Sequence, residues 1–150
     1  MEVDNLLIHV NYGLTSGKTI HNCAILCRDG KIFSVGGASA FKDSYHKFRI
    51  DLPDCYAVPG FIDPHIYGFK GHSIMATDPI EAVQEIALLL PRHGVTTFMP
   101  TLRATTPAKE LEILNKLKSL DNIKGARTAG VHMVGPFISS AKRGANPLEG

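Results

Sequence analysis

The sequence predicts an α/β fold in which a small β unit precedes alternating strands and helices. Short β-branched and aromatic runs fill the first third of the chain, and strand and helix patterns alternate after Gly68. Between them, residues 58–68 read Val-Pro-Gly-Phe-Ile-Asp-Pro-His-Ile-Tyr-Gly, an apolar strand with polar residues near its end. A chain of 150 residues that is 44% hydrophobic has enough apolar side chains for one domain or slightly more.

The first 57 residues are expected to form the β unit. Four runs are rich in β-branched and aromatic residues, at 6–10, 22–27, 32–35 and 48–52. Asp29-Gly30 separates the second run from the third and is a strong hairpin signal.

Helix start signals follow the strand predicted at residues 58–68. Asp78 with Pro79 and Glu81 predicts a capped helix start, and Pro91 predicts its end. The apolar face expected for this helix consists of Ala82, Ile86, Leu89 and Leu90.

A second strand and helix come next. Residues 95–101 form a β-branched run, and Thr106-Pro107 predicts the start of another helix. Its expected apolar face consists of leucines at three-residue spacing: Leu111, Leu114, Leu117 and Leu120. Residues 129–134 predict a third strand, so the order indicates parallel βαβ units.

The candidate chemistry lies at the ends of these strands. Asp63 and His65 are two residues apart and should share one face of their strand. His132 and Val134 are related in the same way on the third strand. Strand ends of this kind carry metal ligands at the rim of a barrel, although a hydrogen-bonded core histidine is the alternative interpretation for His132.

Composition excludes several classes of function. The formal net charge is +2 with scattered basic residues, which predicts no nucleic-acid partner. No apolar run approaches membrane-spanning length, so no membrane partner is expected. Three cysteines without a recognisable secretory signal predict reduced thiols and a cytoplasmic location.

Two sets of motifs carry a resemblance to a known family. Pro59-Gly60-Phe61-Ile62-Asp63-x-His65-x-x-Gly68 resembles the first metal-binding strand of the amidohydrolase superfamily, usually His-x-His, with Tyr67 at the second histidine position. The segments 92–96, 130–139 and 142–147 resemble N-acetylglucosamine-6-phosphate deacetylases, especially Gly130-Val-His-Met-Val-Gly-Pro-Phe-Ile-Ser139.

The resemblance implies a fold and an activity. It implies a small β-sandwich portion at 1–57 and, at 58–150, the first three strands and two helices of a (β/α)8 amidohydrolase barrel. The implied reaction releases acetate from an N-acetyl amino sugar phosphate, using a divalent metal, zinc or similar, that activates water. It implies a vestigial metal ligand at His65, a weaker candidate at His132, and substrate contacts at Ala145 and Asn146.

This sequence departs from the family pattern at important positions. Val134 stands where the family has a metal-binding glutamate, and Asn146 stands where many members have a histidine. A closed barrel takes about 250 residues, so the family's catalytic aspartate is expected beyond Gly150 and no catalytic residue is assigned here. The open barrel edge is expected to need a homo-oligomer or a partner chain.

Two hypotheses follow from the match and the departures. The first is the N-terminal part of a deacetylase that is inactive as this 150-residue chain. The second is a degenerate, non-catalytic remnant or a half-barrel module that binds a partner.

Overall fold

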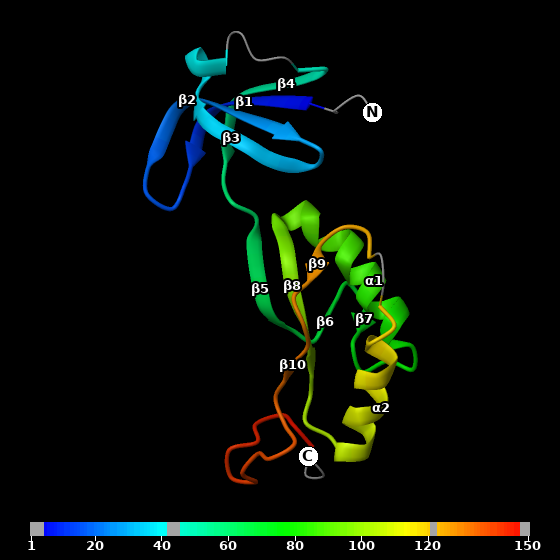
Figure 1. The fold of residues 1–150 in the computed structure, drawn as a ribbon. Helices are drawn as coiled ribbons and strands as arrows, with labels where there is room; N and C mark the ends of the chain where they lie inside the picture. Colours follow the sequence, from blue (N-terminus) through cyan, green and yellow to red (C-terminus); the bar gives the residue numbers. More distant parts are fainter. Residues whose placement is uncertain (1–4, 42–45, 121–122, 148–150) are drawn as a thin grey trace. The chain divides into compact units, whose positions relative to one another are not determined.

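The chain forms two compact units, Met1–Pro59 and Gly60–Gly150. The structure, a computed structural model, describes residues 5–41, 46–120 and 123–147 (Figure 1). The barrel portion expected at 58–150 includes Gly150, which lies outside the described residues. The mixed α/β class is confirmed, with a β unit followed by parallel strands and helices.

The first unit is a four-stranded sheet with the order β3-β2-β1-β4. Its strands are β1 (Asn5–Leu14), β2 (Thr19–Arg28), β3 (Lys31–Gly37) and β4 (Phe48–Ala57). All four predicted strands are present and longer than predicted. β2 pairs antiparallel with β1 and β3, whereas β4 runs parallel to β1. The predicted hairpin turn is confirmed, because Asp29 and Gly30 both have positive φ, 50° and 71°, as such turns require.

One face of this sheet carries a small core. Leu7, Ala24 and Leu26 project from β1 and β2 and are covered by Phe41. Phe41 ends the short 3-10 helix η1 (Ala38–Phe41), which follows β3. The first unit therefore has a helical cover on one face of the sheet.

The second unit is built on a parallel sheet with the order β10-β8-β5. β5 (Phe61–Ile66) and β10 (His132–Met133) lie on either side of β8 (Val95–Leu102), and β9 (Arg127–Thr128) also pairs with β8. A short antiparallel pair, β6 (Gly68–Phe69) and β7 (His72–Ser73), follows β5.

Two helices provide most of the second unit's core with β8. In α1 (Pro79–Leu89), Asp78 Oδ1 accepts hydrogen bonds from the backbone N–H groups of Ile80, at 2.9 Å, and Glu81, at 3.1 Å. α1 ends in the 3-10 turn η2 (Leu90–His93), which contains Pro91. α2 (Pro107–Leu117) is capped by Thr106. Both predicted helix starts are confirmed, because cap and proline act locally.

The prediction of one continuous strand at 129–134 is wrong. The structure instead has β9 and β10, each two residues long, with Gly130 between them at φ 143°. This backbone conformation interrupts a regular strand. The flanking backbone still bonds to β8, since Ala129 N–H donates to Phe98 and Val134 N–H to Leu102.

The leucine stripe predicted for α2 is confirmed in part, because Leu117 is buried and Leu114 and Leu120 pack against the core, but Leu111 does not belong to the buried face. Leu111 is 57% exposed, whereas Glu110, Ile113 and Leu117 are buried. A spacing of three residues drifts around a helix of 3.6 residues per turn, so a strict three-residue series cannot stay on one face.

None of the helices in the described residues is long and apolar enough to span a bilayer.

Candidate functional site

The parallel strands of the second unit bring His65 and His132 together. Ile66 pairs with Pro100 of β8 from one side, and His132 pairs with Thr101 from the other. The two histidines therefore reach across the same point of β8, and their ring centroids are 4.7 Å apart. Parallel strands present their carboxyl ends at one edge of a sheet, where α/β proteins place ligands. The sequence predicted both residues, and the structure places them in contact.

Tyr67 lies on the other side of the His65 ring. Its ring meets that of His65 edge-on, with centroids 4.9 Å apart. His65 is thus flanked by one imidazole and one phenol. The phenol gives this edge a hydroxyl and an aromatic surface at the position where the superfamily usually has a second histidine.

The residues present do not fit a catalytic metal centre on their own. Nδ1 of His132 is buried and has no hydrogen-bond partner, as expected for an atom with ligand capacity. However, the described residues contain no group of three or more His, Cys, Asp or Glu side chains that could hold an ion. Val134 directly follows β10, and its side chain has no lone pair. A catalytic zinc normally takes three protein ligands, so His65 and His132 provide an incomplete set.

Asp63 shapes the end of β5. Its Oδ1 accepts a hydrogen bond of 3.0 Å from the backbone N–H of His65. The strand register also shifts between Asp63 and Ile66. The Asp63 carboxylate is thus engaged with the backbone of its own strand.

Ala145 and Asn146 belong to a loop fixed beside the carboxyl end of β8. Arg103 Nη2 donates to the carbonyl of Ala145 at 2.8 Å. Asn146 Oδ1 accepts from the backbone N–H of Ala104 at 3.3 Å, and Nδ2 donates to the carbonyl of Arg143 at 2.9 Å. Both polar atoms of the Asn146 amide are therefore engaged with backbone, and a substrate contact by this residue stays a prediction.

Glu110 supports the same edge of the sheet and was not singled out from the sequence. Its side chain is buried, and Oε1 accepts from the backbone N–H of Thr105 at 3.3 Å. A Cβ on Gly135 would lie only 2.7 Å from the Cβ of Ala104 and 3.2 Å from this oxygen. Gly135 therefore lets the loop after β10 approach α2 and the end of β8. The glutamate sits in an ordinary helix-start position, so no sequence signal distinguishes it.

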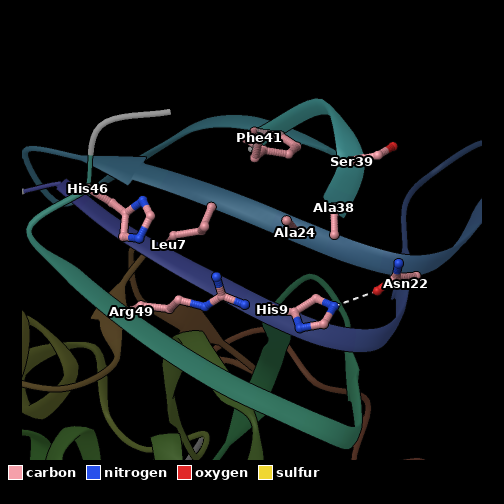
Figure 2. Close-up of a pocket in the computed structure, with 9 residues that line it drawn as sticks. All are labelled: Leu7, His9, Asn22, Ala24, Ala38, Ser39, Phe41, His46 and Arg49. Atoms are coloured by element: carbon pink, nitrogen blue, oxygen red, sulfur yellow. Dashed lines mark hydrogen bonds between the residues drawn. The ribbon is translucent and has the colours of Figure 1, made fainter. Parts of the chain in front are cut away.

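The first unit contains a separate cavity that sequence reasoning did not find. Its volume is about 430 Å³, and it opens between η1 and strands β1, β2 and β4 (Figure 2). His9 lies within it, with Nε2 2.6 Å from Asn22 Oδ1 and Nδ1 3.2 Å from Asp51 Oδ1. The cavity combines this polar group with an apolar floor that includes Leu7, Ala24 and Phe41.

The charges beside this cavity compensate one another. Arg49 donates from Nε and Nη2 to the carboxylate of Asp51, with Nη2 at 2.7 Å from Oδ1. This hydrogen bond lowers the pKa of Asp51 below its ordinary value, and His9 contributes in the same direction. The pair therefore contributes stability at neutral pH, and the contribution is lost as the pH falls through the lowered pKa. Because Arg49 is already paired, it does not offer the cavity an uncompensated positive charge.

Comparisons with known proteins were made for sequence and for structure. No protein-family profile matches the chain. A curated Danio rerio protein is 34% identical over 123 residues, covering 80% of this chain and 30% of the relative. A Bacillus subtilis protein is 30% identical, covering 97% of this chain and 38% of the relative. Both are named N-acetylglucosamine-6-phosphate deacetylase. The chain thus spans about a third of the length of these relatives.

Solved structures agree with the sequence matches. A Thermotoga maritima structure is 30% identical with a TM-score of 0.69, covering 95% of this chain and 34% of that one. A Pasteurella multocida structure has a TM-score of 0.76 at 20% identity, covering 97% and 38%, and shows the shared fold alone. Both are N-acetylglucosamine-6-phosphate deacetylases.

The fold matches that of solved amidohydrolase structures over the N-terminal part of those structures. Within that class, the resemblance to the N-terminal part of the N-acetylglucosamine-6-phosphate deacetylase family is confirmed.

Proposed function

We propose that this chain forms the N-terminal part of an N-acetylglucosamine-6-phosphate deacetylase. The contact between His65 and His132 at the carboxyl ends of parallel strands carries the proposal, because these residues lie within the two motifs that resemble the family. A Mycobacterium smegmatis structure of the enzyme is a complex with N-acetyl-D-glucosamine-6-phosphate. We therefore propose an N-acetyl amino sugar phosphate as the substrate class and zinc or a similar divalent ion as the metal.

The proposal assigns a role to each part of the chain. Residues 1–57 contribute to a β-sandwich, and residues 58–150 supply the first three strands and two helices of a (β/α)8 barrel. His65 and His132 contribute two imidazole donors, while the loop carrying Ala145 and Asn146 lies beside the same strand ends. Further donors are required for a catalytic ion, so this 150-residue polypeptide alone is not expected to hydrolyse the amide.

A non-catalytic role is the second candidate. Val134 in the place of a metal-binding glutamate favours it, since the valine retains the strand contact, N–H to Leu102, but has no donor atom. In that case the parallel sheet, with β5 and β10 at its outer positions, would pair with a partner chain or a second copy.

An assay of acetate release separates activity from its absence. Purified chain supplied with zinc and N-acetylglucosamine 6-phosphate should release no acetate above the rate of a protein-free control. The Bacillus subtilis relative serves as the positive control under the same conditions. Turnover by this chain that a chelator abolishes would contradict the proposed inactivity and would also remove the non-catalytic candidate.

A further inference from the structure

The first turn of α2 contains a buried glutamate. Glu110 is only 3% exposed, although glutamate is among the residue types that are least often fully buried. Burying a carboxyl group is unfavourable unless hydrogen bonds replace those that it made with water. Here Oε1 accepts a hydrogen bond of 3.3 Å from the backbone N–H of Thr105, the residue before the Thr106 cap of α2. The bond therefore ties the interior of the helix start to the chain that enters it.

The connection between β8 and α2, residues 103–106, is held by two side chains. Glu110 accepts from the N–H of Thr105. Asn146 Oδ1 accepts from the preceding N–H, that of Ala104, at 3.3 Å. Because these two N–H groups are consecutive in the chain, a shift of one displaces the other. The bond to Glu110 therefore restrains the bond to Asn146.

The loop at 143–146 folds on itself and is attached to this connection. Asn146 Nδ2 donates to the carbonyl of Arg143 at 2.9 Å, and the backbone N–H of Asn146 donates to the same carbonyl at 3.0 Å. The Arg103 guanidinium donates to the carbonyl of Ala145 at 2.8 Å. The loop is thus a compact turn whose position follows that of the connection.

Gly135 brings the chain after β10 against the same carboxyl group. A Cβ built on Gly135 would lie 2.9 Å from the Cα of Ala104 and 3.2 Å from Glu110 Oε1. The segments that follow β8 and β10 lie at the same end of the sheet (Figure 1). The carboxyl group therefore lies where these two segments meet, and its contacts are interior ones within the second unit.

We propose that Glu110 is a positioning residue for the loop at 143–146. By accepting from the N–H of Thr105, its carboxyl group fixes the connection at 103–106, and the connection holds the loop beside the strand ends. The importance of this loop for the reaction rests on the proposed function, in which the loop lies beside the sugar phosphate.

Amide hydrogen exchange of the full chain, resolved by NMR, tests the proposal. The reporter is the N–H of Ala104, because its acceptor is Asn146 and not Glu110. Glu110→Met fills nearly the same space without an oxygen, and Glu110→Asp keeps the carboxyl group but shortens its reach by a methylene. Each should lower the protection of Ala104 at least about 10-fold, the usual effect of losing one hydrogen bond. Glu110→Gln keeps an acceptor oxygen at the same reach and should retain the protection.

The comparison of methionine with glutamine separates positioning from packing. If Glu110 only filled space, the two variants would behave alike, because both side chains are unbranched and of similar length. The matched control is Glu112→Met on the same helix, where Glu112 is exposed and pairs with Lys109 and Lys116 at 2.9 Å. This change should leave the protection of Ala104 as it is in the unchanged chain.

Three results would overturn the positioning role. It fails if folded Glu110→Met and Glu110→Asp both keep Ala104 protected, or if Glu112→Met exposes it equally. It also fails if Glu110→Gln loses as much protection as Glu110→Met. Circular dichroism identifies a variant that does not fold, and two variants of different chemistry guard against the loss of one. Because no substrate is present, the exchange result is independent of acetate release, which tests the proposed function.

Discussion

Replacing Val134 by glutamate is expected to raise the affinity of this chain for zinc at least about 100-fold, more than the usual effect of an outer-shell metal partner. The change would add a carboxylate two residues beyond His132, directly after the strand whose histidine already contacts His65. His65, His132 and the carboxylate would make three protein ligands, the number that a catalytic zinc site normally uses. Titration calorimetry of the unchanged chain and the variant measures the difference.

Met133→Glu is the matched control for this prediction. Met133 adjoins Val134 but projects to the other side of the strand, so its carboxylate should leave zinc affinity unchanged. Adding His65→Ala to Val134→Glu should remove the gain. Equal gains from Val134→Glu and Met133→Glu would show that added negative charge, rather than a third ligand, accounts for the binding.

Gly125→Ala is expected to lower the free energy of unfolding of the second unit by about 3 kcal/mol. Gly125 has φ 92°, and a Cβ there would lie 2.2 Å from the carbonyl oxygen of Ala87 in α1. That oxygen also accepts a 2.8 Å hydrogen bond from the N–H of Ala126, so the backbone cannot move away without losing it. For a unit of this size the loss corresponds to a fall in Tm of about 12–24 °C.

Gly71→Ala separates the cost of the positive φ from the cost of the clash with the carbonyl oxygen of Ala87. Gly71 has the same φ of 92°, but nothing lies within 4 Å of a Cβ built there. Alanine at this position should lower the free energy of unfolding only by the cost of the positive φ, about 1 kcal/mol. The Tm values of the two variants should therefore differ by about 8–16 °C. Equal Tm values would mean that the Gly125 segment moves away from α1 at little cost.

Local signals in this sequence predicted the elements that depend on neighbouring residues alone. Asp78 and Thr106 cap their helices as expected, because cap and capped N–H groups lie within one turn. The interruption at Gly130 was missed, since it depends on how the chain passes along β8. The leucine stripe of α2 was predicted correctly except at Leu111, which is exposed, for a related reason. The spacing of the leucines resembles a helical stripe, yet contacts with the rest of the second unit bury Glu110, Ile113 and Leu117.

In the candidate site, too, local features could be predicted from the sequence, whereas contacts between distant segments could not. A side-chain period of two and the rim position of strand ends were enough to predict His65 and His132 as candidates. Their contact depends on both strands flanking β8, which local pattern alone does not determine. The bond of Asn146 to Ala104 could not be predicted, because 42 residues separate the two. The network around His9 arises similarly from the parallel pairing of β1 with β4.

The most direct test of the proposed function is the activity of a chimera. In it, this chain replaces the matching segment of the Thermotoga maritima deacetylase, which is 30% identical and covers 95% of the chain. The rate of acetate release is measured for the chimera with Val134, with Val134→Glu and with Met133→Glu. We predict activity at least about 100-fold below the parent enzyme with Val134, and substantial recovery with Val134→Glu alone. A fully active Val134 chimera would contradict the inference that this position limits the site. A folded chimera that stays inactive with Val134→Glu would contradict the deacetylase assignment of this segment.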